Sequence, residues 1–350
     1  MLYQTSNPHG GDLYGRAVKL DLSVNTNPLG TPPSVVRAVE ASARSLCQYP
    51  DPCCRELTAA LAAYEGVGPE AVLCGGGAAE LIYAYCGAVG AVRALTPVPT
   101  FLEYGAALAA FGGETVRFPL REEDGFALTE DFLAQVETTD CRLIFLCDPN
   151  NPTGRLISPE LLEAVCRVCR RRDIRLFVDE CFLELSDAGR EASLAKFLDA
   201  FPNLFLLKAF TKSYGMAGLR LGYCLCGDGA LLSAMSRRVQ PWNVSLPAQA
   251  AGMAALGEGA FLERARKLIR RERPLLAREL EKLGLWVCPS QANYLLVRSG
   301  EPLAGPLLER GILIRDCANY EGLGPGWYRL AVRSREENRV LLDALSAILA

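Results

Sequence analysis

The sequence is poor in histidine and lysine, with one histidine (His9) and six lysines among 350 residues. So little histidine speaks against a zinc site, because zinc centres usually draw on histidine or on four cysteines. Two cysteine pairs have a spacing that metal sites use, Cys166–Cys169 and Cys224–Cys226. Because the first pair lies in a predicted helix and the second in a predicted strand, we expect no bound metal. The few lysines leave few candidates for a reactive amine.

The sequence also lacks a long apolar run and a strong charge of either sign. No stretch approaches the roughly 18 uninterrupted apolar residues that a membrane span needs. Residues 1–5 contain neither the basic region nor the apolar core of a signal peptide, so we expect a cytoplasmic protein. The net charge of -3 speaks against nucleic acid or an anionic membrane as the main partner.

Lys212 is the strongest candidate for a reactive group. Apolar runs at 204–207 and 221–225 flank it and predict two buried strands. A lysine between such strands lies near the apolar interior of a sheet, where burial lowers the pKa of its amine and makes it nucleophilic toward a carbonyl. Arg220 can supply a planar set of donors to a phosphate. The two residues suit an aldehyde cofactor that carries a phosphate; a surface lysine on a turn is the alternative interpretation.

Apolar segments alternate with helical patterns over most of the chain, which indicates an α/β fold. Strands are expected at 71–74, 92–95, 114–118, 142–147, 175–179, 204–207 and 221–225. Helices are expected at 33–46, 55–64, 78–88, 101–112, 129–137, 158–172 and 191–200. Apolar strands joined by helical crossovers predict a mostly parallel, seven-stranded sheet covered by helices on both faces.

Changes in composition divide the chain into three parts. Residues 1–30 are dense in turn-forming residues and are expected to form an ordered arm over a cleft, with a disordered tail as the alternative. Residues 31–240 are expected to form the large domain. Residues 241–350 begin with a long helical segment at 261–283 and continue as a smaller α+β domain.

Polar features fall where several predicted strands end, which is the edge where parallel sheets bind ligands. Glycines 75–77 precede a helix start, and free backbone amides at such a turn attract anions. Residues 148–154 follow another strand, although their asparagine, proline and glycine are also ordinary turn formers. Asp179 ends an apolar strand, and its burial is costly unless it is paired. A cationic ring nitrogen is one possible partner for Asp179.

With these residues in this order, the chain resembles the fold-type I pyridoxal-phosphate enzymes related to aspartate aminotransferase. The resemblance covers nearly the whole chain, and its general motifs are Asn150-Asn151-Pro152-Thr153-Gly154, Val178-Asp179-Glu180 and the segment from Thr211-Lys212 to Arg220. Within this family the chain is most similar to the threonine-phosphate decarboxylases of cobalamin biosynthesis, which are close to the histidinol-phosphate aminotransferases. The motifs for that group are His9-Gly10-Gly11 and residues 25–30, 240–244 and 312–320.

The resemblance implies pyridoxal 5'-phosphate as the cofactor and a homodimer as the assembly. Lys212 would hold the cofactor as a Schiff base, and Asp179 would pair with its protonated ring nitrogen. Asn151 would hydrogen-bond the ring hydroxyl oxygen, and Tyr104 would stack on the ring face. The residues implied for the cofactor phosphate are Arg220, Gly77, Ala78, Ala79, Thr211 and, from the neighbouring subunit, Tyr49.

The resemblance also implies a small phosphorylated amino acid as the substrate. Arg333 would bind its carboxylate, and His9, Asn27 and Arg315 would bind its phosphate. The expected reaction is decarboxylation of L-threonine O-3-phosphate to (R)-1-amino-2-propanol phosphate. Three alternatives stay open: transamination of histidinol phosphate, decarboxylation of O-phosphoserine, and a binding protein that senses a phosphorylated amine with the same fold.

The sequence departs from the family pattern at three places. Ala209 replaces a serine that donates to the cofactor phosphate in many relatives, and Ala78 and Ala79 replace residues with side-chain donors. A hydrogen bond to a charged group is typically worth about 1.5–3 kcal/mol, so we expect looser cofactor binding unless Thr211 or Ser213 compensates. At the third place, Phe182 replaces a tyrosine that bonds the ring oxygen in aminotransferases. This change favours a reaction other than transamination.

Overall fold

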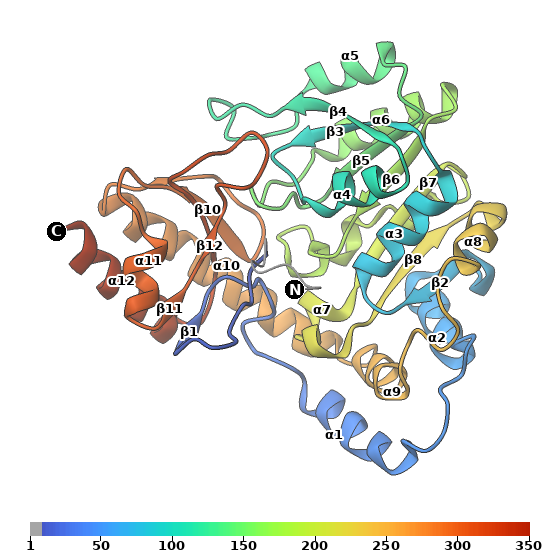
Figure 1. Ribbon diagram of the computed structural model, residues 1–350, viewed down its shortest axis with the longest axis horizontal. Helices are drawn as coiled ribbons and strands as arrows, with labels where there is room; N and C mark the ends of the chain where they lie inside the picture. Colours follow the sequence, from blue (N-terminus) through green and yellow to red (C-terminus); the bar gives the residue numbers. More distant parts are fainter. Residues whose placement is uncertain (1–8) are drawn as a thin grey trace.

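The computed structural model describes residues 9–350, which form a large and a small unit connected by a long helix (Figure 1). The helices of the large unit are α1 (Pro33–Ser42), α2 (Arg55–Glu65), α3 (Ala78–Val89), α4 (Glu103–Ala110), α5 (Glu130–Thr138), α6 (Pro159–Arg171), α7 (Phe210–Ser213), α8 (Gly229–Ser236) and α9 (Leu246–Ala255). Its strands are β2 (Val72–Gly75), β3 (Arg93–Val98), β4 (Glu114–Pro119), β5 (Leu143–Cys147), β6 (Arg175–Asp179), β7 (Leu204–Ala209) and β8 (Gly222–Cys226).

The seven strands of the large unit form one sheet in the order β2-β8-β7-β6-β5-β3-β4. Only β8 runs antiparallel to its neighbours within this sheet, so the expectation of a mostly parallel seven-stranded sheet is confirmed. The register pairs Cys147 with Asp179 and Asp179 with Leu207. The ends of β5, β6 and β7 are therefore level, and the loops that follow them meet at one edge of the sheet.

Side chains of the sheet alternate between two apolar cores, as the two-residue period of a strand requires. On β5, Ile144 and Leu146 pack in the core beneath α2, α5 and α6, whereas Leu143 and Phe145 pack in the core beneath α3, α4 and α8. Both faces are thus covered by helices (Figure 1). Coverage of both faces explains why the strands are apolar throughout rather than alternating with polar residues.

Local signals in the sequence account for where several helices begin. Ser158 accepts a hydrogen bond from the amide of Leu161 and so caps α6, which continues with proline at its first position. Helix α12 (Arg335–Leu349) begins with a capping box, in which the side chains of Ser334 and Glu337 bond each other's backbone amides. Glycine ends α2 at Gly66 in the left-handed conformation that favours it.

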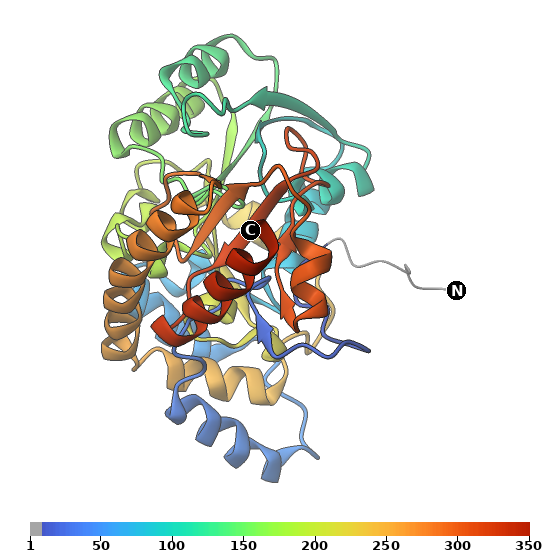
Figure 2. The same cartoon turned by 90° about the vertical axis from the view of Figure 1, so that its left-hand side faces the viewer.

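The small unit combines a short antiparallel sheet with helices. Its elements are β1 (Leu20–Asp21), α10 (Gly259–Lys282), β9 (Trp286–Val287), β10 (Tyr294–Arg298), α11 (Ala304–Glu309), β11 (Ile312–Leu313), β12 (Arg315–Asp316), β13 (Trp327–Ala331) and α12 (Arg335–Leu349). Strands β12-β13-β10-β9 form the sheet, and α10 and α12 lie next to each other beside it (Figure 2). Strand β1 pairs in parallel with β11, which ties the amino-terminal arm to the small unit.

One segment of the large unit differs from the sequence-based expectation. Residues 191–200 were expected to form a helix but form two short 3-10 turns, Arg190–Ala192 and Leu194–Phe197. The reason is that the buried carboxylate of Glu180 accepts hydrogen bonds from the hydroxyl of Ser193 and the amide of Leu194 and holds the segment in place. Helix α9 packs against α1. The expected domain boundary at residue 240 stays a prediction.

Lys208 lies one residue before the end of β7, and its side chain connects this strand to Glu65 at the end of α2 and to Glu180 after β6. Its amine lies 3.0 Å from Glu180 Oε2 and 3.2 Å from Glu65 Oε2, and all three side chains are buried. Burial alone would lower the pKa of Lys208, but the two carboxylates raise the pKa above its ordinary value. The amine therefore stays charged and balances two buried negative charges.

Replacing Lys208 by methionine should destabilise the protein strongly. The substitution keeps the volume of the side chain but leaves Glu65 and Glu180 buried without their cation, which typically costs about 3–5 kcal/mol. Urea unfolding of the apoprotein, followed by circular dichroism, measures the loss. The matched control is Lys282→Met at an exposed ion pair on α10, where we expect a change within about 0.5 kcal/mol. Equal effects of the two substitutions would contradict the role of Lys208.

None of the helices within residues 9–350 is both long and apolar enough to cross a membrane.

Candidate active site

A cavity of about 210 Å³ opens where the loops after β5, β6 and β7 meet the arm and the small unit. The residues that line it are His9, Gly10, Ser23, Val24, Ala78, Ala79, Phe101, Cys147, Asn151, Asp179, Cys181, Phe182, Ala209, Thr211, Lys212, Arg220, Arg315, Tyr320 and Arg329. Four of them are basic side chains other than histidine, and one is a carboxylate. The cavity therefore suits a ligand that carries several negative charges and one positive charge.

Lys212 enters this cavity from α7, directly after β7. Its amine lies 5.6 Å from the ring centre of Phe182. Burial, together with the positive charges of Arg329 and Arg220, lowers the pKa of Lys212 to about 8. A lysine with this pKa is partly unprotonated near neutral pH and can act as a nucleophile.

Asp179 ends β6 and points into the cavity from its buried floor. Its Oδ1 accepts a hydrogen bond of 2.9 Å from the amide of Cys181, and its Oδ2 accepts one of 2.6 Å from the hydroxyl of Tyr104. Burial raises the pKa of Asp179, while these hydrogen bonds oppose that rise. A cation in the cavity would favour the ionised carboxylate further, as a protonated ring nitrogen does.

Arg220 and the start of α3 form the anion-binding end of the cavity. Gly77 precedes α3 with φ of 94°, and a Cβ at this position would lie 2.6 Å from Nη2 of Arg220. A Cβ on Gly222 would lie 2.8 Å from the amide nitrogen of Ala78. The positive φ of Gly77 requires glycine there, and close packing against backbone requires glycine at position 222. The guanidinium of Arg220 lies near Gly77, next to the free amides of Ala78 and Ala79 that begin α3. Gly77 itself shapes this end rather than lining it.

These residues fit the cofactor that the sequence implies, pyridoxal phosphate. Arg220 and the amides that begin α3 would hold its phosphate, Lys212 would meet its aldehyde carbon, and Asp179 would meet its ring nitrogen. Thr211 also lines the cavity, beside Ala209, which has no donor to offer. Asn151 lines it as well, and its Oδ1 accepts hydrogen bonds from Tyr320, at 3.3 Å, and from Arg329.

Arg329, on β13, is a cavity residue that the sequence reasoning missed. Its guanidinium bonds Asn151 and the carbonyl of Ser23 and is almost fully buried. Arg333, which was expected to bind the substrate carboxylate, does not line the cavity. Its guanidinium donates to the carbonyls of Asp21, at 3.1 Å, and Val24, at 3.3 Å. An arginine inside an otherwise apolar strand was the available signal for Arg329.

Tyr104 and Asn27 also have places other than those expected. The ring of Tyr104 stacks on Phe145 at 5.2 Å, outside the cavity, whereas Phe101 lines the cavity. The carboxamide of Asn27 donates to the carbonyl of Ser213 at 2.7 Å, and its own amide donates to the carbonyl of Lys212. Tyr104 therefore supports Asp179, and Asn27 holds the lysine loop.

The remaining predicted residues lie at two separate places. His9 and Arg315 line the cavity, where His9 Nε2 lies 2.8 Å from Glu103 Oε1 and Arg315 donates to the side chain of Asn319 at 2.7 Å. Tyr49 is exposed on the loop after α1 and packs on Trp242 at 4.7 Å between ring centres. Its expected contact with a neighbouring subunit stays a prediction.

A family model described as aminotransferase class I and II matches residues 17–345. The chain belongs to this family. It is 38% identical to a threonine-phosphate decarboxylase from Salmonella typhimurium, over 98% of the chain and 97% of that protein. It is also 35% identical to a histidinol-phosphate aminotransferase from Anaeromyxobacter sp., over 96% of the chain and 92% of that protein.

A solved structure of a similar protein agrees with the fold. Histidinol-phosphate aminotransferase from Sinorhizobium meliloti, in complex with pyridoxal-5'-phosphate, superposes with a TM-score of 0.83 at 25% identity, over 95% of the chain and 91% of that structure. The expected family and the expected fold, a fold-type I enzyme with a large and a small unit, are thereby confirmed.

The lowered pKa of Lys212 predicts how fast the apoprotein couples covalently with added pyridoxal phosphate. Since the unprotonated amine is the nucleophile, the rate should rise with pH through a midpoint near 8 rather than near 10.5. Stopped-flow absorbance of the bound cofactor measures the rate, and Lys212→Ala is the control that should not couple. A midpoint near 10.5 would show that the amine of Lys212 is not buried next to the positive charges of Arg329 and Arg220.

Proposed function

We propose that this protein is a pyridoxal-phosphate-dependent decarboxylase that converts L-threonine O-3-phosphate to (R)-1-amino-2-propanol phosphate for cobalamin biosynthesis. The observation that carries the proposal is the charge pattern of the cavity. Arg220 serves the cofactor phosphate, which leaves Arg315 and Arg329 for a substrate with two anionic ends. The similarity to a threonine-phosphate decarboxylase over almost the whole chain supports the same substrate.

The cofactor, when bound, supplies an electron sink that accepts the charge developing at the substrate's Cα. When the substrate amine takes the place of Lys212 on the cofactor, the released amine of Lys212 would accept the proton that the substrate amine loses. Lys212 would then be placed to donate this proton to Cα once the bond between Cα and the carboxylate carbon has broken and carbon dioxide has left. Asp179 would keep its negative charge next to the ring nitrogen throughout.

Two cationic anchors decide which bond at Cα is broken. Arg329 and Arg315 come from different strands of the small unit, β13 and β12, and can hold both anionic ends of the substrate at once. Holding both ends fixes rotation about the bonds of Cα, so binding energy from a remote phosphate is used for orientation. Phe182 places a ring without a hydroxyl 5.6 Å from the amine of Lys212, which favours a reaction other than transamination.

We also propose that the protein works as a homodimer. Tyr49 is 78% exposed, and Trp242, on which it packs, is 46% exposed. Two large aromatic rings facing solvent together suit a contact with a second copy. In that assembly Tyr49 would reach the cofactor phosphate of the neighbouring subunit.

Purified holoprotein incubated with threonine phosphate should release carbon dioxide and aminopropanol phosphate in equal amounts. Carbon dioxide capture and mass spectrometry of the amine measure the two products. Histidinol phosphate with 2-oxoglutarate is the comparison, and transfer of the amino group without carbon dioxide release would identify an aminotransferase. O-phosphoserine is one methyl group smaller and should react more slowly by about 10-fold, because a single methyl group gives only modest discrimination. Binding without any turnover would indicate a sensor.

Lysine substitutions of the two candidate arginines should separate their roles. Arg329→Lys keeps the charge but loses the planar fork of donors in the cavity, so kcat/KM for threonine phosphate should fall by about 100-fold. Arg333→Lys is the matched control, because its contacts are with backbone carbonyls outside the cavity, and its kcat/KM should stay within about 5-fold of the original. A larger loss at Arg333 than at Arg329 would restore the sequence-based expectation.

A further inference from the structure

The hydroxyl of Tyr104 contacts Asp179 from the protein side of the cavity floor. It donates a hydrogen bond of 2.6 Å to Oδ2, and both side chains are buried. The ring of Tyr104 is held by Phe145, stacked at 5.2 Å and 7° between planes, and by Phe101, edge-on at 5.6 Å. Tyr104 does not line the cavity, so its hydroxyl can influence a bound ligand through the side chain of Asp179.

The surroundings of Asp179 make this hydrogen bond important. The titratable groups that face Asp179 are Tyr104 from α4, Cys147 from β5, Cys181 and Glu180 from the segment after β6, and Lys212 from α7. Burial and the charge of Glu180 both raise the pKa of Asp179 and so favour its neutral form. The donors that oppose this effect are Cys181 and the hydroxyl of Tyr104.

Tyr104 itself remains a donor over the working pH range. Burial is the main reason that the pKa of Tyr104 lies well above the ordinary value for tyrosine, and the neighbouring charge of Asp179 raises the pKa further. The hydroxyl of Tyr104 therefore keeps its proton. A hydroxyl that cannot ionise, held by two aromatic rings, is a fixed donor to the carboxylate.

We infer that Tyr104 is a positioning residue: its hydroxyl keeps Asp179 in the ionised, oriented form that pairs with the protonated ring nitrogen of the cofactor. The inference rests on the cofactor and not on the identity of the substrate. A neutral Asp179 could not hold the proton on the ring nitrogen, and the ring would be a weaker electron sink.

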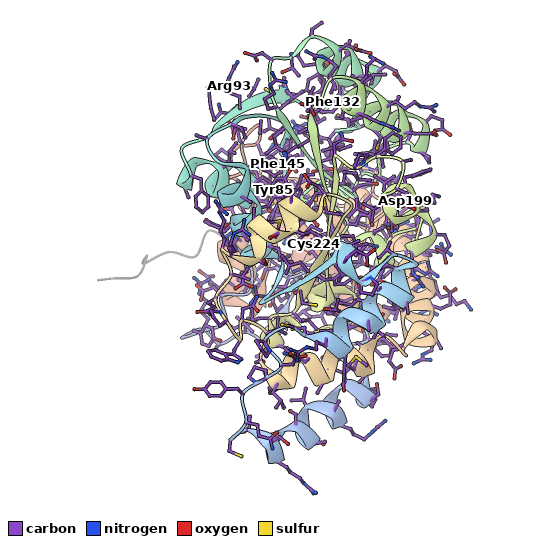
Figure 3. The ribbon with its side chains drawn as sticks, turned by 90° about the vertical axis from the view of Figure 1, so that its right-hand side faces the viewer. Tyr85, Arg93, Phe132, Phe145, Asp199 and Cys224 are labelled. Atoms are coloured by element: carbon purple, nitrogen blue, oxygen red, sulfur yellow. The ribbon has the colours of Figure 1, made fainter. Side chains whose placement is uncertain are left out.

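A neighbouring tyrosine provides a matched control. Tyr85, on α3, lies in the same aromatic cluster, with its ring 6.4 Å from that of Phe145 (Figure 3). It is equally buried, but its hydroxyl has no hydrogen-bond partner among the described residues. Tyr85→Phe therefore removes a buried hydroxyl without removing a donor to Asp179.

The test is a pH titration of the holoprotein loaded with cofactor that carries ¹⁵N at its ring nitrogen. The ¹⁵N chemical shift reports whether this nitrogen is protonated, and no substrate is needed. In Tyr104→Phe the ring nitrogen should lose its proton at a pH about one unit or more lower than in the original protein. The reason is that a hydrogen bond to a charged group typically contributes more free energy than a shift of one pKa unit requires. Tyr85→Phe should titrate like the original protein. Equal curves for all three proteins, or equal shifts for both variants, would overturn the inference.

A second variant shows whether Tyr104 acts through Asp179. In an Asp179→Asn background the charge is already gone, so adding Tyr104→Phe should change the titration no further; an additional shift would overturn the inference. If Tyr104→Phe alone does not fold while the double variant does, folding needs the hydroxyl only when Asp179 is charged. That outcome would support the inference. Failure of both to fold would mean that Tyr104 serves packing alone. Because the readout uses only the cofactor, absence of turnover with threonine phosphate would count against the proposed function and leave this result intact.

Discussion

The level ends of β5, β6 and β7 are the constraint on which the site depends. Because Cys147, Asp179 and Leu207 are partners across the sheet, the loops that follow these strands begin at the same height. Asn151, Asp179 and Lys212 therefore reach one cavity although they are distant in sequence. A shift of one residue in this register would turn Asp179 to the opposite face of the sheet and separate it from the lysine.

Two lysines four positions apart show how the same sheet produces opposite electrostatics. Lys208 points to the side where Glu65 and Glu180 balance it, and its pKa is raised. Lys212 follows the strand into a cavity where Arg220 and Arg329 add positive charge, and its pKa falls to about 8. Burial acts on both amines; the charges around each amine decide whether it is structural or reactive.

The features that could be predicted from the sequence are those encoded within one segment. Asp179 ends a strand, Lys212 and the glycine turn follow one, and Arg220 precedes one. Each of these strands is identified by its own apolar run, so the order of elements was enough to place the residues at one edge. Residues that depend on packing between segments were harder. Arg329 and Arg333 are both arginines close to the end of the same strand, and only their contacts with Asn151 and with the arm distinguish them. The helix predicted for residues 191–200 was wrong for the same reason, because the buried carboxylate of Glu180, from another segment, determines the conformation there.

The arm connects the two halves of the site. Strand β1 pairs with the small unit, Ser23 accepts a hydrogen bond from Arg329, and Asn27 bonds the backbone of the Lys212 loop. Arg329 and Lys212 are thus held in one frame by a segment outside the sheet. Under the proposed function, the sheet edge would form the cofactor end of the cavity, and the arm and the small unit would form the substrate end. Changes in the arm and the small unit can therefore redirect the reaction while the cofactor site stays the same, which is how one fold supports several activities.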